Sequence, residues 1–237
     1  MVSRVNSTEN KGINRVYWNF REQTEEATPS ARRSFFGFGR GGSTALPGEY
    51  TVKIAYDGEE VSQKFSVKYD PRFEVDMAVL KANYEAAKEA QKLSDVINTA
   101  SQQIDGTRAT LKTIQDSARQ NRDPKNRELM QAARELDKKL EELAEILNPT
   151  PPKQGIADRS AGLRSQIMMA TRGMRGGHEP ISQAAKVRYE KAKPKVEEFL
   201  QKVNAVYETD VENLKKMLKE ANFSLFKPFK EIKIEEK

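Results

Sequence analysis

The chain has 237 residues and a mass of 26.9 kDa, enough for one large domain or two small ones with buried cores. It contains no cysteine, which excludes disulfides and thiolate metal sites, and no apolar run of the roughly 20 residues that a membrane span needs. The net charge of +6 comes from interspersed charges, which disfavours a dedicated nucleic-acid-binding surface.

Strand patterns are concentrated in the first seventy residues, and the first of them lies at residues 16–20. Val16, Trp18 and Phe20 alternate along the chain, which predicts a short strand with one apolar face. No apolar h-region of a signal peptide occurs before it. If the protein is exported, we expect its signal to lie outside this chain.

The polar and glycine-rich stretch that follows contains a segment of arginine, phenylalanine and glycine at residues 31–43. RNA-binding segments have such a composition, but one short copy is also typical of a loop. Its aromatic side chains either pack on a neighbouring part of the chain or form a contact surface for another domain. The residues concerned are Phe35, Phe36, Phe38 and Arg40, with Arg32 and Arg33 beside them.

A hairpin is predicted over residues 47–69. The Asp57-Gly58 dipeptide tolerates the positive φ angles of a tight turn, and Leu46-Pro47-Gly48 is a turn sequence before the first strand. We expect the sheet to be held together by Trp18, Tyr50, Val52, Ile54 and Phe65.

Three strands are too few for an immunoglobulin-like sandwich, which needs about seven strands in roughly 100 residues. We therefore predict an α+β chain with a partial sandwich at residues 1–73. The apolar face of this sheet needs a second layer to cover it. We expect that layer to be formed by strands upstream of Met1, by the helices, or by a return strand through Ile232 and Ile234 in a C-terminal extension at 223–237.

Asp70-Pro71-Arg72 ends the β part, because proline cannot donate to a continuing ladder. A 4-3 alternation of apolar residues then predicts a long helix from about Val75 to about Gln120. Asp123 and Pro124 open a second helix, a third runs through Leu163 to Gly176-Gly177, and Glu179-Pro180 opens a fourth with Pro194 inside it. Short connections favour an antiparallel four-helix bundle over residues 74–222.

Catalytic chemistry has little support in this sequence. It has one histidine, and it lacks the H-E-x-x-H, G-x-S-x-G and G-x-x-x-x-G-K-[ST] motifs. Paired carboxylates such as Glu141-Glu142 and Glu197-Glu198 lie among lysines, as on solvated helix faces. We expect no enzyme activity of the chain, no cofactor and no metal.

Four further residues are candidates for interaction. His178 lies in the glycine-rich loop MRGGHEP, where it is either an exposed polar residue or a ligand. Arg164 and Arg175 are eleven residues apart and fall on one helical stripe, with Arg172 close by. These arginines are either solvated or bind an anion or an acidic partner.

Three motifs form a set: GINRVYWNFR at residues 12–21, PGEYTVKI from Pro47, and YDPR from Tyr69. The set resembles the C-terminal region of large bacterial exported proteins built on sortilin-type, BNR-repeat β-propellers, often labelled glycosyl hydrolases. There the pattern is close to G-x-N-R-x-x-W-D-x-R, P-G-x-Y-x-V and D-P-R, followed by a helical segment. Asn19 stands here where that pattern has Asp. The resemblance covers residues 12–72, and the helical remainder more loosely.

The resemblance implies that a propeller and at least one strand of the sandwich precede the first motif. The chain would then be a non-catalytic C-terminal structural and interaction module of a larger exported protein, periplasmic or extracellular, with the upstream propeller or another protein as partner. No sialidase-type Asp-box, S-x-D-x-G-x-T-W, occurs in the chain, so a propeller's activity does not transfer to it.

Two rival hypotheses remain. A self-contained nucleic-acid or anion-binding protein would use the two arginine groups, Arg32, Arg33 and Arg40 with Arg164, Arg172 and Arg175. The second hypothesis, that the chain is part of a glycan hydrolase, rests on the family label alone.

Overall fold

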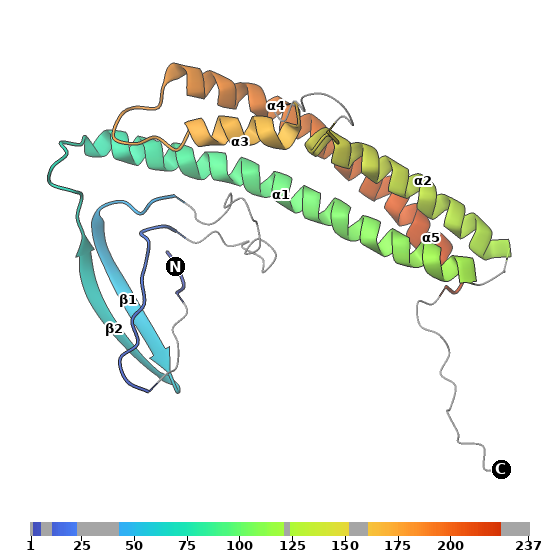
Figure 1. Ribbon diagram of the computed structural model, residues 1–237, viewed down its shortest axis with the longest axis horizontal. Coiled ribbons are helices and arrows are strands. Elements are labelled where there is room, and N and C mark those ends of the chain that lie inside the picture. Colours follow the sequence, from blue (N-terminus) through green and yellow to red (C-terminus); the bar gives the residue numbers. More distant parts are fainter. Residues whose placement is uncertain (1, 6–10, 23–42, 121–123, 152–160, 224–237) are drawn as a thin grey trace, which may run out of the picture. The chain divides into compact units, whose positions relative to one another are not determined.

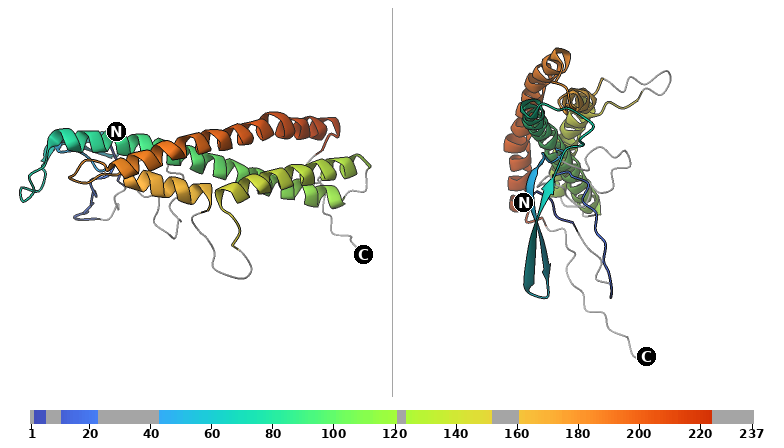
Figure 2. Two further views of the ribbon diagram at one scale, coloured as in Figure 1. Left: turned by 90° about the horizontal axis from the view of Figure 1, so that it is seen from above. Right: turned by 90° about the vertical axis from the view of Figure 1, so that its left-hand side faces the viewer.

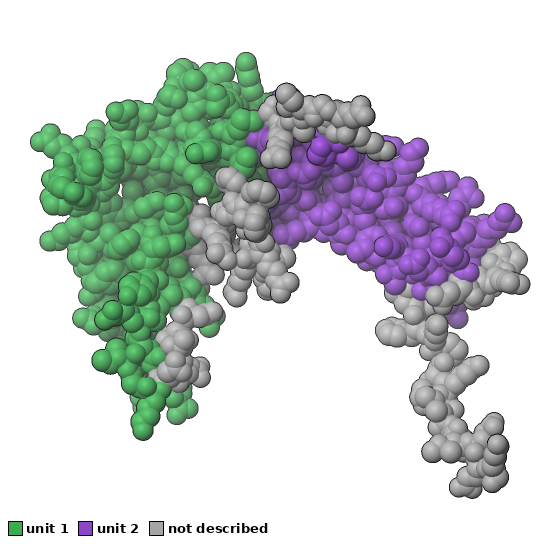
Figure 3. Space-filling view, viewed as in Figure 1, with its two compact units in different colours: residues 1–95, 167–192 green, residues 96–166, 193–237 purple. Residues whose placement is uncertain are grey.

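The computed structural model describes residues 2–5, 11–22, 43–120, 124–151 and 161–223. The fold is mixed α and β and mostly helical, with one two-stranded sheet in the described residues (Figure 1). The chain forms two compact units: unit 1 contains residues 1–95 and 167–192, and unit 2 contains residues 96–166 and 193–237 (Figure 3).

The sheet of unit 1 is the predicted hairpin. Strand β1, Gly48–Tyr56, pairs antiparallel with β2, Glu59–Val67, as a twisted ribbon (Figure 2). Asp57 and Gly58 have φ angles of 48° and 82°, the two positive values that a tight hairpin turn requires. The register places Tyr50 opposite Phe65 and Ile54 opposite Val61, so these four residues share one face.

The strand predicted at residues 16–20 is not formed. Phe20 has a φ of 58°, which interrupts an extended backbone, and Asn19 Oδ1 accepts a hydrogen bond from the backbone amide of Arg21 at 3.2 Å. The segment instead makes one isolated bridge, between Arg21 and Thr44. The predicted return strand through Ile232 and Ile234 lies outside the described residues.

Three helical segments complete unit 1. They are the first part of α1 (Met77–Gln120), most of α3 (Leu163–Gly173) and the start of α4 (Gln183–Val206). Asp76 caps α1, because its Oδ1 accepts a hydrogen bond from the amide of Ala78 at 2.8 Å. A buried cluster of Ala90, Met174 and Tyr189 joins these segments.

Unit 2 contains the rest of α1, α2 (Pro124–Leu147), and α4 continued through a π-helical turn, η2 (Tyr207–Val211), into α5 (Glu212–Glu220). In this unit α1, α2 and α5 run side by side in the views of Figures 1 and 2. The largest side chains buried in its core are Ile97, Ile104, Leu111, Leu129, Leu140, Leu147, Val196 and Phe199.

The helical periodicity predicted the buried positions well. The predicted seams of α2 and α3 are buried throughout, at Leu129, Ala133, Leu136, Leu140, Leu143, Leu147, Leu163, Ile167, Ala170 and Met174. Helix α4 continues through Pro194, so the chain does not divide there into two helices. No helix in the described part of the chain is long and apolar enough to cross a membrane.

Candidate interaction surfaces of unit 1

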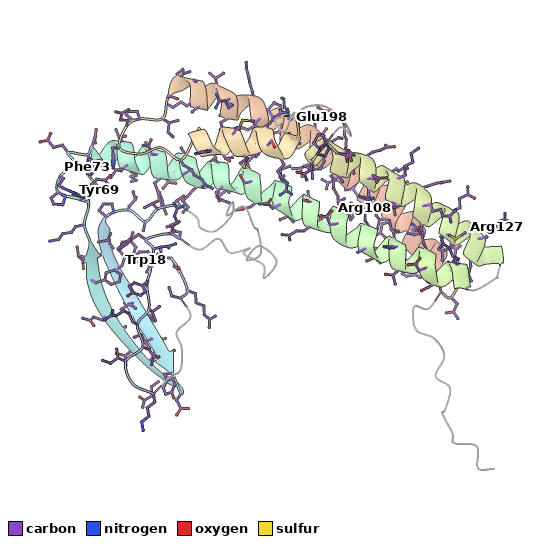
Figure 4. All side chains as sticks on the ribbon, viewed as in Figure 1. Trp18, Tyr69, Phe73, Arg108, Arg127 and Glu198 are labelled. Atoms are coloured by element: carbon purple, nitrogen blue, oxygen red, sulfur yellow. The ribbon has the colours of Figure 1, made fainter. Side chains whose placement is uncertain are left out.

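Four aromatic rings pack together at the base of the hairpin. The ring centroid of Trp18 lies 5.4 Å from that of Tyr50, 5.1 Å from that of Phe20 and 6.2 Å from that of Phe65 (Figure 4). Tyr50 and Phe65 are cross-strand partners with centroids 6.0 Å apart. Such tilted and offset pairs contribute about 0.5–1.5 kcal/mol each beyond their buried area. The cluster therefore fixes residues 18–20 against the hairpin.

The same face of the hairpin is open beyond this cluster. Val52, Ile54, Tyr56 and Val61 are 45%, 65%, 72% and 69% exposed. Val52 and Ile54 thus lie on the predicted face, but the described residues leave them largely uncovered. On this face Gln63 lies opposite Val52 and Glu59 lies opposite Tyr56, so polar residues border the exposed apolar ones. Exposed apolar residues that gather on one face are typical of interaction sites. We call these four residues the open face.

The segment that bridges to the chain just before the hairpin is tied to α1 by a hydrogen bond. The hydroxyl of Tyr84 donates to Glu22 Oε1 at 2.5 Å. Burial raises the pKa of Tyr84 strongly, and the carboxylate of Glu22 raises it further, because both disfavour the phenolate. Burial also raises the pKa of Tyr50, again with a contribution from Glu22.

We expect unit 1 to lose stability at alkaline pH. Because the folded-state pKa of Tyr84 is raised, its contribution is fully present below the pKa of about 10 of an unfolded tyrosine, and is lost as the pH rises from there through the folded-state pKa. Urea unfolding followed by circular dichroism between about pH 9 and pH 11 measures this loss. Tyr84→Phe should reduce the pH dependence. Tyr17→Phe, at a side chain 77% exposed, should leave it unchanged, and equal behaviour of the two variants would contradict the assignment.

His178 is part of a second aromatic contact. Its Nδ1 is hydrogen-bonded to the hydroxyl of Tyr69, and its ring stacks on that of Phe73 with centroids 5.0 Å apart and an interplanar angle of 14° (Figure 4 labels Tyr69 and Phe73). Asp70 and Arg72 lie between Tyr69 and Phe73 in the sequence. The guanidinium of Arg72 forms an ion pair with the carboxylate of Asp70 at 2.5 Å and lowers the pKa of that carboxyl. The loop between α3 and α4 therefore contacts the chain that leaves the hairpin.

Asn83 holds this loop in place, and the sequence reasoning missed it. Its amide donates to the carbonyl oxygens of Gly177 at 3.0 Å and Glu179 at 2.8 Å, and the residue is only 6% exposed. Gly176 lies so close that a Cβ there would be 2.5 Å from Asn83 Cγ. An asparagine in an apolar seam next to a glycine-rich loop is the signal that could have indicated this contact.

The predicted arginines lie in different units. Arg164 is in unit 2, where it donates to Asn98 Oδ1 at 3.3 Å and keeps a buried Nε without a partner among the described residues. Arg172 and Arg175 are in unit 1, and Arg175 donates to Gln91 Oε1 at 3.5 Å. The other candidates, Phe35, Phe36, Phe38 and Arg40 with Arg32 and Arg33, lie outside the described residues.

A pocket of about 190 Å³ lies among the described residues of unit 2. Its two lysines have partners: Lys195 donates to Gln166 Oε1 at 2.6 Å, and Lys202 forms an ion pair with Glu198 at 2.8 Å. Typical ligand pockets are about 300–1,000 Å³. A small pocket whose two lysines already have hydrogen-bonding partners is a weak candidate for a ligand site.

In the described part of the chain, no group of three or more histidine or carboxylate side chains could hold a metal ion. Comparisons of the chain with protein-family models, curated proteins and solved structures find no match. The resemblance of residues 12–72 to sortilin-type propeller proteins therefore stays a prediction.

Proposed function

We propose that the chain is a non-catalytic structural and interaction module, the C-terminal part of a larger exported β-propeller protein of the BNR or sortilin type. The observation that carries the interaction role is the open face of the hairpin, with Ile54 and Val61 about two-thirds exposed. In this proposal the hairpin belongs to an immunoglobulin-like sandwich, and the helices belong to one antiparallel four-helix bundle.

The physical support is the incompleteness of the β part. A two-stranded hairpin is at best marginally stable in water, and stable sheets need further strands or a packed layer over their apolar face. Here the aromatic cluster at Trp18 covers only the base of that face, and Val52 and Ile54 remain exposed. A sheet face that residues 11–22 and 43–73 leave uncovered, next to a well-packed helical core, is what a module made for association would present.

The proposal is tested by the intact mass of the native polypeptide, recovered separately from the exported and the cytoplasmic fractions of the source cells. We expect a product several times heavier than 26.9 kDa in the exported fraction. A cytoplasmic product of about 26.9 kDa would contradict the proposal.

The rival nucleic-acid or anion-binding function has no specific observation in its favour. Arg164 lies in one unit and Arg172 and Arg175 in the other, and the remaining arginines of that hypothesis lie outside the described residues. Micromolar binding to single-stranded nucleic acid that weakens steeply with salt would support the rival function.

A further inference from the structure

The end of α5 carries an asparagine whose side-chain amide has no hydrogen-bond partner among the described residues. Asn222 is exposed and is the second residue after α5, which ends at Glu220. Its φ is 47°, and its backbone amide donates to the carbonyl oxygen of Lys219 at 3.0 Å, while that of Phe223 donates to Leu218 at 3.0 Å. These are the two bonds of a Schellman cap, where asparagine tolerates the left-handed conformation. The cap explains the backbone of Asn222 but uses no atom of its side chain.

The residues that follow give this side chain a chemical role. Asn222-Phe223-Ser224 matches N-x-[ST], the acceptor sequence of N-linked glycosylation, in which the middle residue is not proline. Ser224 comes directly after the described residues, so its part in the motif rests on the sequence. A helix cap needs only the asparagine, whereas the acceptor needs both the asparagine and the hydroxyl residue two positions later. The presence of the serine is therefore explained by the acceptor and not by the cap.

Two other asparagines of the chain have a hydroxyl residue at the same spacing. In Asn148-Pro149-Thr150 the middle residue is proline, which the acceptor sequence does not allow, and the hydroxyl of Thr150 is already hydrogen-bonded to the carboxylate of Glu145. Residues 6–8, Asn-Ser-Thr, match the motif but lie outside the described residues. In the described part of the chain, Asn222 is thus the exposed asparagine that begins an allowed acceptor, and the exposed Asn148 is a built-in control.

We propose that Asn222 accepts an N-linked oligosaccharide when the chain is exported. The donor is an oligosaccharide carried on a lipid pyrophosphate. The amide nitrogen, Nδ2, bonds to C1 of the first sugar while the bond from C1 to the pyrophosphate oxygen breaks. One amide proton passes to a base of the transferase, and the lipid pyrophosphate leaves. This rests on the export proposed above, because N-linked acceptors are used in secreted proteins, and it adds a modification site to the exported chain.

The folded chain accommodates a sugar at this position. Nδ2 forms the new bond without giving up a hydrogen bond to the described residues, and the exposed side chain leaves room for a bulky group. The backbone has to open locally during transfer, because the amides of Asn222 and Phe223 are bonded to the last turn of α5. Helix ends fray and open more readily than any other part of a helix. The cap therefore slows the transfer without preventing it.

Transfer in vitro tests the acceptor directly. The full 237-residue chain is incubated with a purified oligosaccharyltransferase and its lipid-linked oligosaccharide, then digested with trypsin and analysed by mass spectrometry. We expect the glycan on the peptide of residues 220–230, which contains Asn222, and none on the peptide of residues 140–153, which contains Asn148. Asn222→Gln and Ser224→Ala should each abolish the modification, whereas Ser224→Thr should retain it. Ser224→Ala leaves the helix cap intact, so its effect cannot come from a lost fold.

The same peptide, taken from the exported fraction of the source cells, tests the modification in the cell, and we expect it to carry the glycan. Three results would overturn the proposal: no transfer in vitro, transfer that Ser224→Ala leaves unchanged, and an unmodified Asn222 in an exported product. A heavy exported product with an unmodified Asn222 would refute the glycosylation alone. A cytoplasmic product of 26.9 kDa whose Asn222 accepts the glycan in vitro would refute only the larger-protein proposal.

Discussion

Replacing Phe199 by alanine is expected to lower the free energy of unfolding by about 3–5 kcal/mol. Phe199 is 2% exposed and is among the largest fully buried side chains of the described residues. It lies in α4 between Val196 and Val203, one helical turn from each, and both are also 2% exposed or less. Removing the ring deletes its burial free energy and leaves a cavity that the surrounding side chains close only in part.

Urea unfolding followed by circular dichroism measures this loss. Glu197→Ala, two residues away on the exposed side of α4, is the matched control and should change the free energy by less than about 0.5 kcal/mol. Phe199→Leu should lose less than Phe199→Ala, because more of the volume is kept. A loss below about 1 kcal/mol for Phe199→Ala would mean that the core of unit 2 does not determine the stability of the chain.

The helices could be predicted because their signal is local and repeated. Each buried position of α2, from Leu129 to Leu147, follows from the previous one by a step of three or four residues, and every one of them is buried. The turn at Asp57-Gly58 was predictable for a similar reason, since its positive φ angles depend on two adjacent residues.

The π-helical turn at Tyr207–Val211 was not predictable from the same period. The apolar pattern drifts after Val206, and the extra residue of a π turn moves the pattern back so that Leu214 is buried. The turn is held by tertiary contacts: the hydroxyls of Tyr207 and Thr107 lie 2.8 Å apart, and Lys139 forms an ion pair with Asp210 at 2.8 Å.

The candidate site was predictable in part. Alternation predicted that Tyr50 shares a face with Val52 and Ile54, and the register places Phe65 opposite Tyr50 on that face. That the ring of Trp18 packs on Tyr50 and Phe65 does not follow from alternation. Alternation also predicted a strand at residues 16–20, where Asn19 Oδ1 accepts a hydrogen bond from the amide of Arg21 and Phe20 has a positive φ, so the chain bends instead. Hydrogen bonds between a polar side chain and the nearby backbone compete with strand pairing, and a pattern of apolar residues does not reveal them.

The contact between His178 and Tyr69 could not be predicted, because it joins residues 109 positions apart. It depends on where the loop after α3 is placed, and that placement depends on Asn83. The two acceptors of the Asn83 amide, Gly177 and Glu179, flank His178 directly. The position of the histidine is therefore set by a buried side chain in α1 rather than by the histidine itself.

Asn83→Ala is accordingly expected to lower the free energy of unfolding by about 1–3 kcal/mol, because the two hydrogen bonds to Gly177 and Glu179 are lost and each is worth about 0.5–1.5 kcal/mol, while water can solvate the carbonyl oxygens of these exposed residues. The measurement is urea unfolding, together with amide hydrogen exchange at residues 174–182, which should become faster. Gln103→Ala, at an exposed amide side chain of the same helix, is the control and should cost less than about 0.5 kcal/mol.

The assignment can be checked by a second route that leaves Asn83 in place. Gly176→Ala puts a methyl group 2.5 Å from Asn83 Cγ, so either the loop or the amide must move, and the amide cannot move without losing its bonds at Gly177 and Glu179. Both variants should therefore release His178 from Tyr69, which the imidazole resonances in an NMR spectrum would report. If Gly176→Ala frees the loop while Asn83→Ala leaves the histidine resonances unchanged, then the loop's own backbone, and not the asparagine, holds His178 against the hairpin.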